Sequence, residues 1–210
     1  MLVNGAADDD AVVEITLPDD DPGADAELRR RWPPTGLRRL DGEPGTAPSA
    51  RYRLGGPTTA GWDRLESDLG LFAAERVADR VAVHAALAVV DGRAVVLPGR
   101  SFTGKTTLGL ALAAAGAVLA SDEYALVDPT TGLVTGWPRP ARVRLSAGES
   151  RREPVAGTIP PTPVALVALL RHDGAHGDDP AVTPEPVSRA DAVVRILDET
   201  VCARSRPEAS

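Results

Sequence analysis

The sequence predicts an α/β fold in which helices flank a mixed β-sheet. Two apolar, β-branched runs at 81–90 and 94–97 are separated by an Asp-Gly dipeptide, which closes tight antiparallel hairpins because both positions tolerate positive φ. A glycine-rich loop at 99–104, a small-residue helix at 105–115 and a second apolar strand follow, an order typical of a βαβ unit with a parallel sheet. Antiparallel and parallel strands together make the expected sheet mixed.

Composition limits what the 210-residue chain can be. Its 43% hydrophobic and 25% charged residues are typical of a soluble globular protein. The net charge of −7 argues against a protein that binds DNA or RNA by broad phosphate neutralisation, so we expect any phosphate binding to be local. We expect a cytoplasmic protein without a membrane span, because no apolar run is long enough, Met1–Asp10 lacks a signal-peptide pattern, and the single Cys202 cannot form an internal disulfide.

The N-terminal part of the chain is weakly specified. Over residues 1–60, acidic runs, prolines and glycines interrupt strand-like pieces at 12–17 and 51–54. The run Arg29–Arg31 lies beside many acids, so we expect a solvated surface or partners for those acids rather than a nucleic-acid patch. Apolar steps of three and four residues then predict an amphipathic helix over 61–80 that leads into the main domain.

The main domain is expected to span 61–202, followed by a frayed tail at 203–210. The apolar run 164–171 lacks alternation, which predicts a strand buried on both faces. Ser188 is expected to cap the final helix. The other elements expected after the helix at 105–115 are a strand at 118–127 interrupted by Ser121–Glu123, short strands at 133–137 and 142–145, and the final helix at 189–201.

Residues 99–106 carry the P-loop pattern GxxxxGK[ST] between a strand and a helix, where its mechanism requires it. Its backbone N–H groups and the helix N-terminus favour a polyphosphate. Lys105 is expected to reach the β- and γ-phosphates, and the Thr106 hydroxyl to bind Mg²⁺. The chain has 22 arginines and a single lysine, Lys105. We interpret this exception as a site where a compact ammonium fits and a broad guanidinium would not. The expected nucleotide-binding residues are Gly99, Arg100, Ser101, Phe102, Thr103, Gly104, Lys105, Thr106 and Thr107.

Three further residues are candidates for the same site. Asp122 and Glu123 follow an apolar run and are expected at the carboxyl end of a strand beside the P-loop. Adjacent carboxylates on an extended segment face opposite sides, so one would hold Mg²⁺ and the other would accept the proton of an attacking hydroxyl. A pair of solvated acids is the alternative. His84 lies in an otherwise apolar strand, where a hydrogen-bonded core histidine is the commoner role.

Together these residues resemble the HPr kinase/phosphorylase superfamily, bacterial P-loop enzymes that phosphorylate a serine hydroxyl, and more closely its short HPr-kinase-like relatives. Three elements match in order and spacing: His84 fifteen residues before Gly99, the P-loop itself, and an acidic pair that begins seventeen residues after Lys105. The segment Pro138–Pro140 and the closing helix extend the resemblance over about residues 79–201.

The resemblance implies the HPr-kinase-like variant of the P-loop fold, with ATP and Mg²⁺ as cofactors. It implies that Lys105 and Thr106 bind nucleotide and metal, that Asp122 is the general base, and that His84 is a catalytic neighbour of the phosphates. The acceptor would be a hydroxyl, above all a serine of a protein or peptide. The oligomeric state of full-length relatives favours a homo-oligomer.

The sequence also departs from the family pattern. Phe102 stands where the family usually has glycine, and Glu149 is only a positional candidate for a later metal-binding glutamate. The basic loop used for phosphorolysis has no clear counterpart, which argues against that reaction. Arg139, Arg142 and Arg144 fit contacts with a phosphate or an acidic partner as well as an exposed arginine face. Three functions stay open: a phosphotransferase acting on a protein or peptide, a nucleotide-binding accessory module, and a small-molecule kinase.

Overall fold

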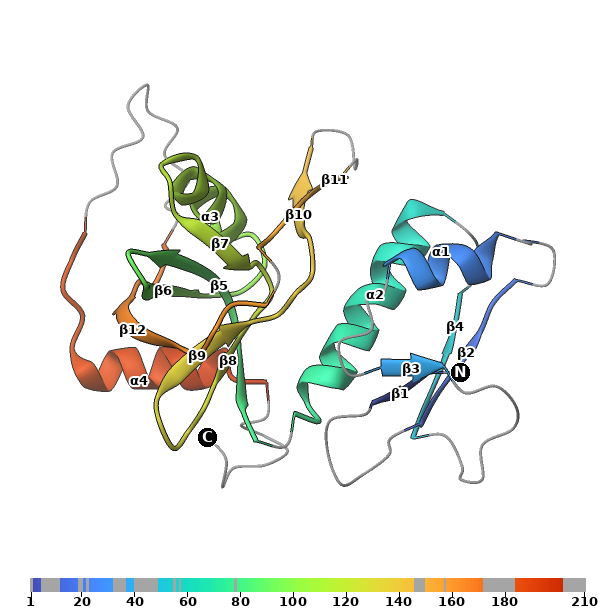
Figure 1. Cartoon of the computed structure of the whole chain (residues 1–210), viewed down its shortest axis with the longest axis horizontal. Coiled ribbons are helices and arrows are strands. Elements are labelled where there is room, and N and C mark those ends of the chain that lie inside the picture. The colour runs from blue at the N-terminus through green and yellow to red at the C-terminus, as the bar shows by residue number, and fades with distance from the viewer. Residues whose placement is uncertain are drawn as a thin grey trace. The chain divides into compact units, whose positions relative to one another are not determined.

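The computed structural model describes residues 2–4, 12–18, 21, 23–31, 37–39, 49–54, 56, 58–77, 79–145, 150–156, 158–171 and 184–201. The chain divides into two compact units, 1–78 and 79–210 (Figure 1). Strands and helices are interspersed and the larger sheet is mixed, so the expected α/β class is confirmed at this level. Among the helices of the described segments, none has the length and apolar character needed to cross a membrane.

The first unit combines a four-stranded sheet with two helices. Strand β1 pairs antiparallel with both β2 and β3, whereas β2 and β4 are parallel, giving the order β3-β1-β2-β4. The segment expected to be weakly specified therefore contributes four strands and a helix. The elements of this unit are β1 (Leu2–Asn4), β2 (Val12–Thr16), α1 (Ala24–Arg31), β3 (Leu37–Arg39), β4 (Ala50–Arg53) and α2 (Thr59–Ala74).

Helix α2 belongs to this first unit, which corrects the domain boundary expected at residue 61. Thr58 caps it, since its Oγ1 accepts a hydrogen bond of 3.1 Å from the Gly61 backbone N–H. The periodicity predicts the buried face of the helix, but it does not identify the elements on which that face packs. The apolar face of α2 joins a core made of Trp62, Leu65, Leu69 and Phe72 from the helix with Val13, Ala24 and Leu54.

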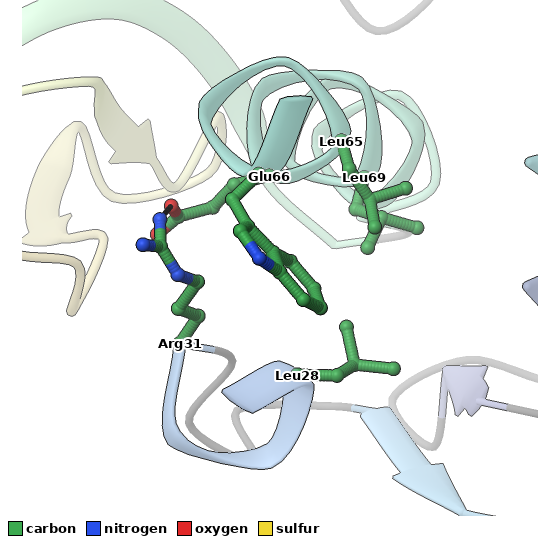
Figure 2. Close-up of a pocket in the computed structure, with 6 residues that line it drawn as sticks. Leu28, Arg31, Leu65, Glu66 and Leu69 are labelled. Carbon is green, nitrogen blue, oxygen red and sulfur yellow. Dashed lines mark ion pairs between the residues drawn. The ribbon is translucent and has the colours of Figure 1, made fainter. Parts of the chain in front are cut away.

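A small pocket lies between α1 and α2 (Figure 2). Figure 2 shows Leu28 facing Leu65 and Leu69 on one side, and Arg31 facing Glu66 on the other. The Arg31 guanidinium lies 3.9 Å from the buried Glu66 carboxylate. Arg29 and Arg30 pair with acids of their own helix, at 3.0 and 2.6 Å. The arginine run thus provides intramolecular partners for acids, as its charge pattern indicates.

In the second unit, β5 (Val81–Val90) and β6 (Arg93–Pro98) form the expected antiparallel hairpin. Asp91 and Gly92 at its turn have φ of 48° and 72°, which confirms the prediction from the Asp-Gly dipeptide. The helix α3 (Lys105–Ala114) also agrees with the prediction, and Gly116, with a φ of 102°, follows its end.

The larger sheet runs in the order β6-β12-β9-β8-β5-β7, and an additional pairing of β6 with β5 closes it on itself. Strands β6 and β12 are parallel, and the other neighbours are antiparallel. Strands β6 and β7 run in the same direction, but β5 lies between them. The expected βαβ order is present, since α3 connects two strands of the same direction, but the sheet around it is mixed and the α3 crossover spans one intervening strand. The strands are β7 (Val118–Ser121), β8 (Tyr124–Val127), β9 (Leu133–Gly136) and β12 (Thr162–Val167).

The sheet lies between two helices. Val83, Ala85 and Leu87 of β5 belong to its core, against which Ile196 of α4 (Arg189–Asp198) packs. The opposite face of β5 meets α3, where a Cβ on Gly109 would lie 3.9 Å from Ala86. Figure 1 shows the sheet with α3 on one side and α4 on the other.

Two further expectations concern the chain after β9. Strand β12 pairs on both edges, but Leu166 is 53% exposed, so the expectation of a strand buried on both faces is wrong: an apolar run does not say which face is covered. Ser188 caps α4 as expected, since its Oγ accepts from the Asp191 N–H at 3.1 Å. Strands β10 (Ala141–Arg144) and β11 (Ser150–Glu153) form a separate pair. Glu149, Cys202 and the tail 203–210 lie outside the described residues.

Candidate functional site

The P-loop connects β6 to α3, and local contacts set its conformation. The Gly99 N–H donates to the His84 carbonyl at 3.2 Å, which fixes the start of the loop to β5. A Cβ on Gly99 would lie 2.8 Å from the Thr103 Oγ1, so a larger residue there would push this hydroxyl from its hydrogen bond to the Arg100 carbonyl. Gly104, with a φ of 92°, is the N-cap of α3 and has no side chain to accept hydrogen bonds from the first N–H groups of the helix. Those N–H groups can therefore serve an anion.

Lys105 is the buried cation of the site, with 6% of the residue exposed. Its Nζ donates to the carbonyl of Gly99 and, at 2.9 Å, to that of Arg100. The ammonium is thus held against the P-loop backbone. Burial lowers the pKa of Lys105, and the carboxylates whose charges oppose this shift are those of Asp122, Glu199 and Glu123.

Asp122 meets the P-loop through Thr106, whose Oγ1 donates to Asp122 Oδ2 at 3.0 Å. The other carboxylate oxygen, Oδ1, is buried and has no hydrogen-bond partner within the part of the chain that the structure describes. Burial raises the pKa of Asp122, and hydrogen bonds from Thr106 and the Arg142 backbone partly oppose the increase. A buried carboxylate oxygen is costly unless it binds a cation or a proton, so this oxygen is available for either.

The acidic pair Asp122 and Glu123 lies where strand pairing with β5 is interrupted. Strands β7 and β8 pair in turn with the same edge of β5, and the ladder stops at Asp122 and Glu123 between them. Ser121 Oγ accepts from the Tyr124 N–H at 3.3 Å, which stabilises the turn. The alternation of side chains between the two faces of a continuous strand is lost here, so the directions of the two carboxylates are set independently. The interruption within residues 118–127 agrees with the prediction from the sequence.

Glu123 contacts a different partner from Asp122. Its carboxylate forms an ion pair with Arg139, whose side chain is 10% exposed. Across the described ranges, no group of three or more His, Cys, Asp or Glu side chains is arranged to hold a metal ion. Of the three residues expected to bind metal, Thr106 and Asp122 are joined by a hydrogen bond. Glu123 forms its ion pair with Arg139.

His84 faces the P-loop side of the sheet. Strand alternation places it on the same face of β5 as Ala86, which lies towards α3. Its side chain is 31% exposed, so it is not a core histidine. Burial and the Lys105 ammonium lower the pKa of His84 to about 4, and the imidazole is therefore neutral at pH 7.

Phe102 lies exposed on the P-loop. The residue is 79% exposed and has a φ of 72°, a conformation that glycine adopts without strain. The Arg144 guanidinium stands 4.2 Å from the centre of its ring, within the range of a cation–π contact. The three arginines at positions 139, 142 and 144 therefore differ: Arg139 pairs with Glu123, the backbone of Arg142 donates a hydrogen bond to Asp122, and the Arg144 guanidinium stands over the Phe102 ring.

Glu199 is a site residue that the sequence does not predict. It follows α4, where its carbonyl accepts the His84 N–H at 2.8 Å. Its carboxylate lies 3.7 Å from His84 Nδ1 and 3.8 Å from Arg100 Nε. No spacing or motif connects residue 199 with the P-loop, so only the pairing of this late segment with β5 reveals it.

Comparisons of the chain with protein-family models and with curated proteins found no match. The site is therefore defined by its own geometry. It combines a glycine loop around a buried ammonium, a hydroxyl hydrogen-bonded to a carboxylate, and a neutral imidazole.

Proposed function

We propose that this protein is an ATP- and Mg²⁺-dependent phosphotransferase with an HPr-kinase-like fold, which transfers a phosphoryl group to a hydroxyl. The observation that carries the proposal is the contact of Thr106 with Asp122 at 3.0 Å beside the buried Lys105. An ammonium, a hydroxyl and a carboxylate at a helix N-terminus are the groups that phosphoryl transfer requires. The proposal places the reaction in the cytoplasm.

The residues present fit both cofactors. Backbone N–H groups of the P-loop and the first turn of α3 suit the phosphates, and Lys105 supplies the positive charge. Thr106 Oγ1 and the buried Oδ1 of Asp122, which has no hydrogen-bond partner among the described residues, are oxygen ligands of the kind that Mg²⁺ prefers. When bound, the metal ion would neutralise charge on the phosphates.

The chain's own groups supply the remaining chemistry. Lys105 exchanges the carbonyls of Gly99 and Arg100 for phosphate oxygens when nucleotide binds. Asp122 accepts the proton of the acceptor hydroxyl as the general base. The acceptor oxygen forms a bond to the γ-phosphorus as the bond from that phosphorus to the leaving diphosphate breaks. His84 is a neutral neighbour of this region.

A nucleotide-binding module without turnover is the second candidate. The ion pair of Glu123 with Arg139 favours it, because among the described contacts an arginine, and not a metal ion, neutralises this carboxylate. The two candidates differ in the acceptor. A kinase transfers the phosphoryl group to an acceptor hydroxyl, and a binding module has no acceptor. A small-molecule kinase would use the same residues with a different acceptor.

The experiment compares Asp122→Asn with the wild-type protein and with Asp91→Asn. Asp91 is an exposed turn residue with positive φ, a conformation in which asparagine is well tolerated, so it is a matched control. Nucleotide binding is measured by calorimetry, and transfer from γ-labelled ATP to a panel of serine peptides, small alcohols and water is measured by mass spectrometry. We expect Asp122→Asn to bind nucleotide but to lose transfer by about 100-fold or more, and Asp91→Asn to match wild type.

Two other outcomes would decide against parts of the proposal. Full transfer by Asp122→Asn would remove Asp122 from the role of base. Nucleotide binding by the wild-type protein without any labelled product would favour the binding module.

A further inference from the structure

The side chain of Arg144, the last residue of β10, contacts the P-loop from outside the loop. We infer that Arg144 is a second phosphate-binding cation of this site: its guanidinium, which lies on the Phe102 ring, exchanges that contact for the γ-phosphate of a bound nucleotide. The inference rests on the proposed function, because it concerns the same P-loop site.

Strand β10 connects the surroundings of Asp122 with those of the P-loop. The Arg142 backbone donates a hydrogen bond to Asp122. Two residues further along the strand, the Arg144 guanidinium stands 4.2 Å from the centre of the Phe102 ring. The strand also contacts α3, the helix that begins with Lys105. One short strand therefore holds both the proposed base and the Arg144 side chain at the site.

The positive charge of Arg144 is not neutralised by a carboxylate. Among the described residues, no acid forms an ion pair with Arg144, whereas the carboxylates of Glu123 and Glu199 lie beside other arginines. Burial and, after it, the charge of Arg144 lower the pKa of Lys105, so the guanidinium and the ammonium repel each other. An anion that contacts both cations relieves this repulsion, and a triphosphate is such an anion.

The contact with Phe102 is one that Arg144 can give up. Phe102 is 79% exposed, and a cation–π contact on an exposed ring is weak. A guanidinium that binds phosphate oxygens forms charge-assisted hydrogen bonds, often two in parallel, which are stronger than the ring contact. The exchange of ring for phosphate is therefore favourable.

The position of Asp122 indicates which phosphate Arg144 contacts. To accept the proton of the acceptor hydroxyl, Asp122 must lie on the acceptor side of the γ-phosphate. Arg144 follows by two residues the backbone group that binds Asp122, so it approaches the triphosphate from the same end. An arginine on the transferred group neutralises the charge that develops there during transfer. We therefore expect Arg144 to favour ATP over ADP.

Isothermal calorimetry of the full chain with Mg²⁺ and either ATP or ADP tests the inference. Two variants, Arg144→Ala and Arg144→Gln, remove the charge, and Phe102→Leu removes the ring but keeps a bulky apolar side chain at the same positive φ. The matched control is Arg151→Ala. Arg151 is exposed and pairs in register with Val143, so strand alternation puts it on the opposite face of the β10–β11 pair from Arg144.

We expect both Arg144 variants to bind ATP about tenfold more weakly than the wild type, a loss of about 1.4 kcal/mol, and to bind ADP within about twofold of it. Arg151→Ala should match the wild type with both nucleotides. Phe102→Leu should bind ATP at least as tightly as the wild type, because the guanidinium no longer has to leave the ring. Thermal unfolding without nucleotide establishes that each variant is folded.

The inference is overturned if the Arg144 variants bind ATP as the wild type does, or if they weaken ATP and ADP equally, since Arg144 would then only support the loop. It is also overturned if Phe102→Leu loses as much ATP affinity as Arg144→Ala. A folded wild-type protein that binds no nucleotide overturns the proposed function together with this inference. A wild-type protein that binds ATP but transfers no phosphoryl group overturns the phosphotransferase alone and leaves the Arg144 result intact.

Discussion

His84 is neutral in the folded protein at pH values where an unfolded chain protonates its histidines. Burial and the nearby Lys105 hold its pKa at about 4, below the ordinary value of 6.5. The folded state therefore binds fewer protons than the unfolded state between these two values. The stability that His84 contributes is complete above pH 6.5 and is lost as the pH falls towards 4.

We predict that His84→Gln reduces the loss of stability between pH 7 and pH 4. The wild-type second unit should lose up to about 3 kcal/mol more unfolding free energy than the variant over this range. Denaturant unfolding at a series of pH values measures both curves. Parallel curves for the two proteins would show that His84 is not held neutral by the fold.

Residues whose chemistry depends on local spacing could be predicted from the sequence, and residues brought in by tertiary pairing could not. The P-loop pattern and the position of Asp122 follow from local patterns in the sequence. In the structure, Asp122 accepts a hydrogen bond from Thr106. The ion pair of Glu123 with Arg139 and the approach of Glu199 depend on how strands pair across the unit, for which a single sequence carries no periodic signal.

At the scale of elements, the contact between β9 and β7 supports the acidic segment. A Cβ on Gly136 of β9 would lie 2.4 Å from the carbonyl oxygen of Ala120, two residues before Asp122. Backbone atoms cannot give way as a flexible side chain can. Close approach therefore requires glycine at this position.

We predict that Gly136→Ala lowers the unfolding free energy of the second unit by about 2 kcal/mol. The matched control is Gly56→Ala, because a Cβ on Gly56 meets nothing within 4 Å. Thermal unfolding of both variants checks the prediction. Equal melting temperatures would contradict the close packing of β9 on β7.

The predictions of individual elements agree better with the structure than the prediction of how they connect. The hairpin β5–β6, the helix α3 and the cap of α4 follow from turn dipeptides, small-residue runs and a serine, all of which act locally. The position of β5 between β6 and β7, and the exposure of Leu166, depend on which strands become neighbours. Hydrophobic patterns do not encode that choice.

At the scale of the whole molecule, the described residues form two hydrophobic cores, one in each unit. Leu69 is 1% exposed in the core of the first unit, and Leu87 is 0% exposed in the core of the second. Because each core belongs to one unit, the two units can unfold in separate transitions. The proposed nucleotide site lies within residues 79–210.

We predict that Leu69→Ala and Leu87→Ala each destabilise one calorimetric transition, by about 3 kcal/mol, and leave the other in place. Mg²⁺ with ATP should raise only the transition that Leu87→Ala lowers. A single transition that both variants lower equally would contradict the division into two units.

The central claim is that the P-loop backbone and Lys105 bind the triphosphate of a nucleotide. Isothermal calorimetry of the full chain with Mg²⁺ and ATP tests it most directly, with Lys105→Ala as the variant and Asp91→Asn as the control. We predict one binding site in the wild type and in the control, and at least a tenfold loss of affinity, about 1.4 kcal/mol, in Lys105→Ala. Absence of binding heat at several temperatures with folded wild-type protein, or equal affinity in Lys105→Ala, would contradict the account.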